Sequence, residues 1–552
     1  MSGATDIANL VARTTAAQSR ASDPASSAWV SANAGTGKTQ VLTTRILRLL
    51  LAGTAPERIL ALTYTTAAAA EMSKRVFDRL GTWVTASDDG LANMLRVVLG
   101  RAPTTDEAAR SRHLFARAIE TPGGLKVQTI HAFCERLLQR FPLEARVPPN
   151  FSILDDATAA EMRAIASDEV LMAAARDPGS ATGRALLTVI AYATDDDFDT
   201  ILKDAIANRR WLQGLSLLPP SHTGDVRTEL YNGALGLPRD ASIETIERQM
   251  AMVLDDGLIA RLVPALGNGS PKTDVVLAEK LARARLAKTR DARIGEVRDA
   301  LLTKDGDPRS DRFVTKAVRT AAPELIAQLE RARDRFAELE DQRRAALAVE
   351  ATVALATLAD AILTRFDADK SRRALLDFDD LIRKTAFLLG HENPDADASN
   401  TAWVLFKLDG GLEHILVDEA QDTSPAQWAV VEALAAEFFS TAGDAHRTMF
   451  AVGDEKQSIY AFQGAAPEMF AATGRKFAST AAAAGARWTN VPLDVSFRTT
   501  EPVLAAVDAV FADPATTPGL TAEGDETAAK IRHFAVRTGQ AGLGELWPPE
   551  AY

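Results

Sequence analysis

The segment from Ala32 to Thr39 constrains the fold of this 552-residue chain more than any other feature. It reads ANAGTGKT, and its two glycines allow backbone turns that a side chain would obstruct. The apolar run AWVSA at 28–32 precedes it, and apolar residues recur at helical spacing after it. A second strand-then-helix pattern follows at 59–80. Strands and helices that alternate in this way predict an α/β fold with a parallel sheet.

This segment matches the phosphate-binding pattern called Walker A, with alanine at the position of the usual first glycine. Gly35 and Gly37 would let successive N–H groups and a helix N-terminus face a polyphosphate. Lys38 would bind the β and γ phosphates, and the Thr39 hydroxyl is a candidate magnesium ligand. We therefore expect ATP and Mg²⁺ as cofactors. The predicted nucleotide contacts in the loop are Ala32, Asn33, Ala34, Gly35, Thr36, Gly37, Lys38 and Thr39.

An acidic pair, Asp418 and Glu419, follows the apolar residues HILV at 414–417. Asp418 would hold magnesium, directly or through water, because a hard cation prefers oxygen ligands. Glu419 is the candidate general base that orients the attacking water. The 380 positions between Lys38 and Asp418 exceed what a minimal nucleotide-binding domain needs, so the sequence predicts an insertion.

The insertion is predicted to be helical. From about 156 to 377 the chain is rich in Ala, Leu, Arg and Glu and has few β-branched runs. Within it, 323–369 predicts one or two long helices, whose charges indicate either a solvated face or a DNA-contacting arm. Strand patterns return at 414–420, 448–460 and 488–497, so the block would separate two halves of one sheet domain.

Composition excludes several classes of protein. Lys and Arg number 62 against 74 Asp and Glu, so a nucleic acid would have to bind in a local groove. Cys134 is the one cysteine, which excludes an internal disulfide and a cysteine-rich metal centre. No uncharged run of 18 apolar residues occurs, and the first 20 residues lack the layout of a secretory signal. We therefore expect a cytoplasmic protein without a membrane partner.

Six motifs in order resemble those of the UvrD/Rep-like DNA helicases of superfamily one: SANAGTGKT, LALTYTTAAAAEM, GGLKVQTIHAFCERLLQRFP, HILVDEAQDTSPAQW, VGDEKQSIYAFQGA and VPLDVSFRT. The wording of VQTIHAFCERLLQRFPLEARVPPNF, GDEKQSIYAFQGA and DFDDLI looks most like the AddA family, the helicase-nuclease subunits of a bacterial double-strand break repair complex. The resemblance spans roughly 18–550. It implies an ATP-dependent helicase that moves 3′ to 5′ on single-stranded DNA, acts on DNA ends in recombinational repair and pairs with an AddB-like subunit.

The resemblance also implies a domain plan. A first RecA-like motor domain, a P-loop NTPase domain, would comprise 1–155 and 378–495. The helical insertion, 156–377, would be an accessory arm, and 496–552 would begin a second RecA-like domain.

Further ATP-site residues follow from the resemblance. Gln18 corresponds to the glutamine that recognises adenine, although it could instead be a surface residue. Gln457 would sense the γ-phosphate with support from Asp454. Arg498 would reach that phosphate as an arginine finger, and a structural ion pair is the alternative.

For DNA, Tyr64 and Phe462 fall where the family stacks aromatic rings on bases, and a place in the core is the alternative. Thr63, Thr65 and His131 fall where the family contacts backbone phosphates. Such contacts read no base sequence, so binding should weaken with salt.

Two helicase motifs are missing, because no histidine opens an HGAKGLE-like motif and no tyrosine precedes ALTRA. We therefore expect a fragment of a longer product, or a naturally shortened protein, without the family's nuclease domain. It should bind nucleotide, hydrolyse it weakly and not unwind DNA. Two other hypotheses stay open: a single-polypeptide UvrD or Rep helicase, and a truncated module that binds ATP or single-stranded DNA without turnover.

Overall fold

The structure is a computed structural model, and its chain divides into two compact units. Residues 1–154 and 374–552 form the first unit, and Asp155–Arg373 form the second. The residues that the structure describes are 2–122, 124–207, 226–390, 403–404, 407, 411–436, 438–439, 447–460, 464–512, 533–543 and 545.

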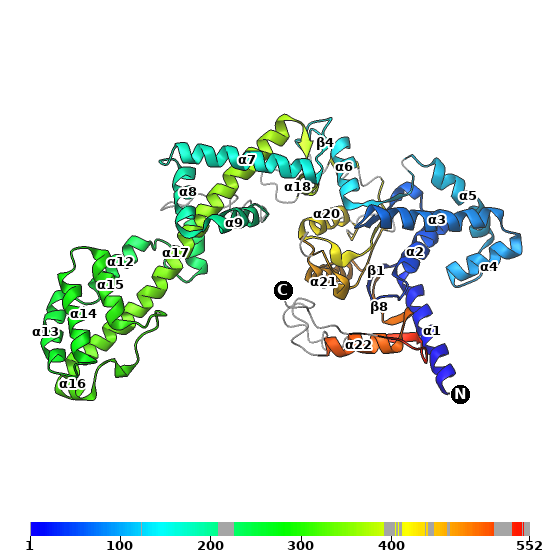
Figure 1. The fold of residues 1–552 in the computed structure, drawn as a ribbon. Coiled ribbons are helices and arrows are strands. Elements are labelled where there is room, and N and C mark those ends of the chain that lie inside the picture. The colour runs from blue at the N-terminus through cyan, green and yellow to red at the C-terminus, as the bar shows by residue number, and fades with distance from the viewer. Residues whose placement is uncertain are drawn as a thin grey trace. The chain divides into compact units, whose positions relative to one another are not determined.

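A six-stranded sheet forms the centre of the first unit, and every adjacent pair of its strands is parallel (Figure 1). This confirms the α/β fold predicted from the sequence. The order across the sheet is β3 (Lys126–Thr129), β2 (Ile59–Thr63), β6 (His414–Val417), β7 (Thr448–Gly453), β1 (Ser27–Ala32) and β8 (Trp488–Leu493).

Helices cover both faces of the sheet, so its central strands are apolar on both sides. On β2, Ile59 and Ala61 pack into one core, and Leu60 and Leu62 pack into the other. The first core includes α1 (Ser2–Ala21), α2 (Lys38–Ala52), α3 (Thr66–Thr85), α4 (Asp88–Leu99) and α5 (Thr105–Glu120). The second includes α6 (Ile130–Arg140), α18 (Phe378–Leu388), α20 (Pro425–Ala435) and α21 (Pro467–Ala483).

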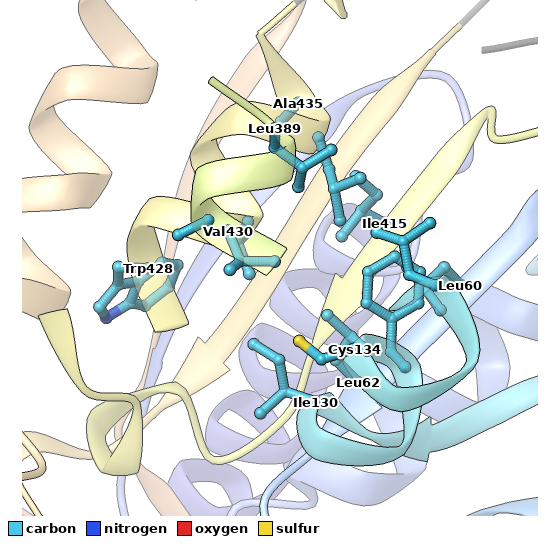
Figure 2. Close-up of a cluster of buried hydrophobic side chains, with 14 of the residues drawn as sticks. Leu60, Leu62, Ile130, Cys134, Leu389, Ile415, Trp428, Val430 and Ala435 are labelled. Atoms are coloured by element: carbon cyan, nitrogen blue, oxygen red, sulfur yellow. The ribbon is translucent and has the colours of Figure 1, made fainter. Parts of the chain in front are cut away.

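Figure 2 shows part of the second core, where side chains from distant segments meet. Ile130 and Cys134 of α6 lie near Leu62 of β2, and Val430 and Ala435 come from α20. This core joins segments on both sides of the helical insertion, so the two halves of the sheet domain fold as one body.

The predicted strand at 488–497 is wrong in one respect, because it breaks at Asp494. β8 ends at Leu493, and β9 (Val495–Thr500) pairs in parallel with β10 (Phe534–Arg537) in a separate sheet. β8 is an edge strand, so its continuation can leave the large sheet, and the Asp494 carbonyl accepts a hydrogen bond from Phe534 N. Helix α22 (Glu501–Phe511) follows β9. That these residues begin a second motor domain stays a prediction.

The second unit is helical, as the composition of the insertion predicted. Its longest element, α17 (Pro323–Arg372), is one continuous helix of 50 residues. The other α-helices described in it are α7 (Asp156–Arg176), α8 (Ala181–Tyr192), α9 (Asp195–Ala207), α11 (Val226–Ala234), α12 (Ile243–Met252), α13 (Asp256–Gly267), α14 (Asp274–Leu286), α15 (Arg290–Leu301) and α16 (Lys316–Ala321).

Helix α17 is long and apolar enough, by length and composition alone, to cross a membrane. It nevertheless packs along one side on α7, α8 and α9, and 44% of its most apolar stretch is buried. Leu358, Ile362 and Phe366 are fully buried in these contacts. Such burial is typical of a core helix.

The two short strands β4 (Ser152–Ile153) and β5 (Leu375–Leu376) lie where the chain leaves the first unit and returns to it. They pair in parallel, with Ser152 opposite Leu375.

Cys134 provides a simple test of the packing. Its side chain is fully buried, and burial raises the pKa of its thiol to about 12. Because the thiolate is the reactive form, we expect iodoacetamide at pH 8 to leave the native protein unlabelled and to label the urea-unfolded protein once per chain. Mass spectrometry distinguishes the two results, and rapid labelling of the native protein would contradict the described core.

Candidate nucleotide-binding site

The predicted site residues lie at one edge of the large sheet, where parallel strands end. Ligands of open α/β sheets bind at this carboxyl edge. The loop 32–39 follows β1, Tyr64 and Thr65 follow β2, His131 follows β3, Asp418 and Glu419 follow β6, Asp454 and Gln457 follow β7, and Arg498 follows β8 on the adjoining β9.

The loop after β1 is shaped to receive an anion. Gly35 and Gly37 have φ values of 74° and 89°, in the left-handed region that favours glycine. The Thr36 hydroxyl donates to the Asn33 carbonyl at 2.8 Å, which closes the loop on itself. Helix α2 begins at Lys38, and Gly37 before it offers no side-chain cap. The first N–H groups of the helix therefore stay available to phosphate oxygens.

Lys38 faces the acidic pair across the loop. Its Nζ lies 3.3 Å from Glu419 Oε2 and 3.4 Å from Gln457 Oε1. The lysine side chain is 10% exposed and that of Glu419 is 38% exposed. A pair this open to solvent contributes about 1 kcal/mol or less, so a triphosphate can replace the carboxylate as the partner of the lysine.

Asp418 and Glu419 are neighbours in the chain with different surroundings. Burial, with a smaller contribution from the charge of Glu419, raises the pKa of Asp418 to about 7. Asp418 Oδ1 is buried without a hydrogen-bond partner, so this oxygen fits a cation ligand. The backbone of Glu419 turns at φ 46°, in the left-handed region, and its side chain contacts Lys38.

Sequence reasoning missed Gln421, which links the residues around the acidic pair. Its side chain is 1% exposed. Nε2 donates to Glu419 Oε2 at 3.0 Å and to Asp422 Oδ2 at 3.1 Å, while Oε1 accepts from Asp454 N at 2.9 Å. One amide thus ties the end of β6 to the end of β7. An uncharged polar residue inside the run DEAQD was the only sequence signal for it.

Lys456 also went unpredicted, although it joins β7 to the phosphate-binding loop. Its Nζ donates to Asn33 Oδ1 at 2.8 Å and lies 2.9 Å from Asp454 Oδ1. Asp454 in turn accepts a hydrogen bond from Gln457 Nε2, so the predicted support of Gln457 by Asp454 is present as a contact.

Gln18 and Arg498 approach the loop from opposite ends of the chain. Gln18 Nε2 donates to the Thr36 carbonyl at 2.9 Å, so this glutamine lies against the loop. Arg498 is exposed on β9, and the neighbouring Phe497 N donates to the Gly35 carbonyl at 2.9 Å. β9 is therefore docked on the loop, while the predicted phosphate contact of Arg498 stays a prediction.

The residues predicted to bind DNA have varied surroundings. The rings of Tyr64 and Tyr460 lie 4.4 Å apart at an angle of 35°, and Tyr460 was not predicted. Thr63 is buried, and the Thr65 hydroxyl accepts from Ala68 N as the cap of α3. The contacts of two further predicted or neighbouring positions complete this edge: His131 packs edge-on against Phe378, with its pKa lowered by burial, and Phe462 lies outside the described residues.

A glycine loop whose lysine meets an acidic pair at the carboxyl edge of a parallel sheet is the arrangement of P-loop nucleotide-binding domains. The sequence model of the UvrD/REP helicase N-terminal domain matches residues 14–478, and the chain belongs to this family. An ATP-binding helicase domain, as the motifs indicated, is thereby confirmed.

Curated relatives include several proteins named as the AddA subunits of ATP-dependent helicase/nucleases. That of Bacillus licheniformis is 26% identical over 512 residues, which cover 87% of this chain and 38% of the relative. That of Lactiplantibacillus plantarum is 26% identical and covers 80% of this chain and 35% of the relative. That of Lactobacillus delbrueckii subsp. bulgaricus is 27% identical, with coverages of 87% and 38%. The chain thus spans little more than a third of the length of these relatives.

Gly35 provides a test of the loop geometry. A Cβ there would lie 2.6 Å from Ser496 Oγ and 2.9 Å from Arg498 Cβ, and the positive φ adds strain of about 1 kcal/mol. We expect Gly35→Ala to weaken ATP binding at least about tenfold, measured by titration calorimetry. Gly485→Ala is the control, because Gly485 has a φ of 66° but open space around it. Unchanged affinity in Gly35→Ala would contradict the described loop.

Proposed function

We propose that this chain is the ATP-driven motor part of an AddA-like protein, which translocates 3′ to 5′ on single-stranded DNA during double-strand break repair. The relatives named as helicase/nuclease subunits support this assignment, although each is only distantly similar. The observation that carries the motor proposal is the contact of Lys38 with Glu419 and Gln457, from segments 381 and 419 positions away.

Within the proposed site, the loop at 32–39 holds the triphosphate of ATP, and Gln18 reads its adenine. Lys38 moves from Glu419 to the β and γ phosphates, which leaves Glu419 free to orient water. Thr39 and the unpartnered Asp418 Oδ1 hold Mg²⁺, which neutralises phosphate charge when bound. Among the described residues, no group of three or more His, Cys, Asp or Glu could hold a metal, so magnesium would bind with the nucleotide.

Single-stranded DNA and DNA ends are the proposed substrates, and an AddB-like subunit is the proposed partner. Tyr64, with Tyr460 beside it, offers aromatic surface for bases beyond the end of β2. The proposed location is the cytoplasm, with no membrane partner.

Substitution of Lys38 and Glu419 tests the motor. We expect a low ATPase rate that single-stranded DNA raises, and we expect Lys38→Ala to remove both nucleotide binding and this rate. Glu419→Gln should keep nucleotide binding but lower the rate at least about 100-fold, because it removes the general base. Steady-state hydrolysis with and without DNA, with binding measured in parallel, checks both variants.

The results also separate the motor from its alternatives. Nucleotide binding in the wild type without any effect of DNA on hydrolysis would support a module without turnover. No loss of binding in Lys38→Ala would remove the proposed site itself. Co-purification with an AddB-like subunit would favour AddA over a single-polypeptide helicase.

Tyr64 provides a separate test of DNA binding. Loss of one stacked base costs about 1 to 3 kcal/mol, so Tyr64→Ala should weaken binding of oligo-dT by at least about fivefold. Tyr64→Phe keeps the ring and should bind as the wild type does. Fluorescence anisotropy at fixed salt measures both, and equal affinities for the Ala and Phe variants would exclude stacking on Tyr64.

A further inference from the structure

Two arginines of α2, Arg45 and Arg48, are buried in the first unit and are not used by the proposed mechanism. They lie three residues apart, so they project from the same face of the helix that begins at the phosphate-binding loop. Arg45 is fully buried, and burial lowers the pKa of its guanidinium to about 9. A fork of charged donors kept in so unfavourable a place must satisfy several acceptors at once.

Arg45 binds the end of α1 and the turn after it. Nη1 donates to the carbonyls of Ala21 at 3.1 Å and Asp23 at 2.8 Å. Nη2 donates to the Ser26 carbonyl at 2.6 Å and to Thr448 Oγ1 at 3.0 Å. Since Thr448 is the first residue of β7, one side chain joins α1, α2 and the central sheet.

Arg48 binds the same end of α1 one turn further along α2. Nη1 donates to the Ser19 carbonyl at 2.9 Å, and Nη2 donates to Ser19 Oγ at 3.2 Å. Its Nε donates to the Val98 carbonyl at 2.6 Å, near the end of α4. The carbonyl end of a helix carries partial negative charge, which favours both arginines at this position.

Gln18 is adjacent to Ser19 on α1, and its Nε2 reaches the Thr36 carbonyl of the loop. The side chain of Gln18 is therefore positioned by a helix whose last turn is fastened to α2 by Arg48 and Arg45. The loop residues 36 and 37 immediately precede α2. The same helix thus places both the phosphate-binding loop and, through its two arginines, the glutamine beside that loop.

We propose that Arg45 and Arg48 are positioning residues for nucleotide selection, which hold Gln18 where it distinguishes adenine from other bases. This inference rests on the proposed function, in which Gln18 reads adenine. Neither arginine touches the nucleotide. Without the fastening, α1 still forms, but its last turn is free to shift, and the Gln18 amide loses its fixed place beside the loop.

The test measures the preference for ATP over GTP by equilibrium titration of the full chain, which requires no turnover. Lysine cannot span several acceptors, so Arg48→Lys should lower this preference about fivefold, as should Gln18→Ala, since each removes about one hydrogen bond's discrimination. In the double variant the two losses should not add, because both act through the same amide.

Arg112→Lys is the matched control. Arg112 of α5 donates in the same manner to the carbonyls of Trp83, Val84 and Ala86 at the end of α3, away from Gln18. We expect it to lower the melting temperature as Arg48→Lys does while leaving the ATP preference unchanged. The same variant pair made at Arg45 repeats the test if Arg48→Lys retains its fold poorly.

Three outcomes would overturn the inference. The first is an Arg48→Lys variant that is less stable yet keeps the full ATP preference, since the arginine would then be only structural. The second is additive losses in the double variant. The third is an unchanged preference in Gln18→Ala, which removes adenine reading by Gln18 while ATP binding through Lys38 stands. Loss of ATP binding in the wild type would instead remove the proposed function.

Discussion

The parallel register of six strands is the constraint on which the candidate site depends. It brings the ends of β1, β6 and β7 to one edge, and there Lys38 lies 3.3 Å from Glu419 although 381 positions separate them. A slip of one residue in β6 would turn Leu416 and Val417 to the opposite faces and would misplace the acidic pair. The two cores that β6 enters, one on each face, make such a slip costly.

Much of the fold could be predicted from local patterns. The buried runs at 28–32 and 59–63 are apolar because helices cover both faces of the sheet, and such runs are visible in the sequence. The loop at 32–39 was predictable since few sequences other than glycine-rich ones adopt its φ values. Even the helical insertion followed from arithmetic, because a site that joins Lys38 to Asp418 needs something folded between them.

What sequence patterns could not show are contacts between polar side chains that are distant in the chain. Gln421, Lys456 and Tyr460 acquire their roles only when the ends of β6, β7 and β2 meet. Arg45 looked like one basic residue among many in TTRILRLL, and its burial depends on carbonyls of a helix that precedes it. The break of the strand pattern at Asp494 likewise depends on β10, a partner some 40 positions downstream.

The pairing of β4 with β5 has a consequence for how such a protein can change over time. Leu154 N donates to the Leu376 carbonyl at 2.9 Å, so the points where the helical unit departs and rejoins are held side by side. Neighbouring strands are about 4.8 Å apart, a gap that a very short linker can bridge. The whole unit is therefore a cassette between fixed connectors, which a lineage can enlarge, trim or exchange while the strands that carry the glycine loop and the acidic pair keep their places.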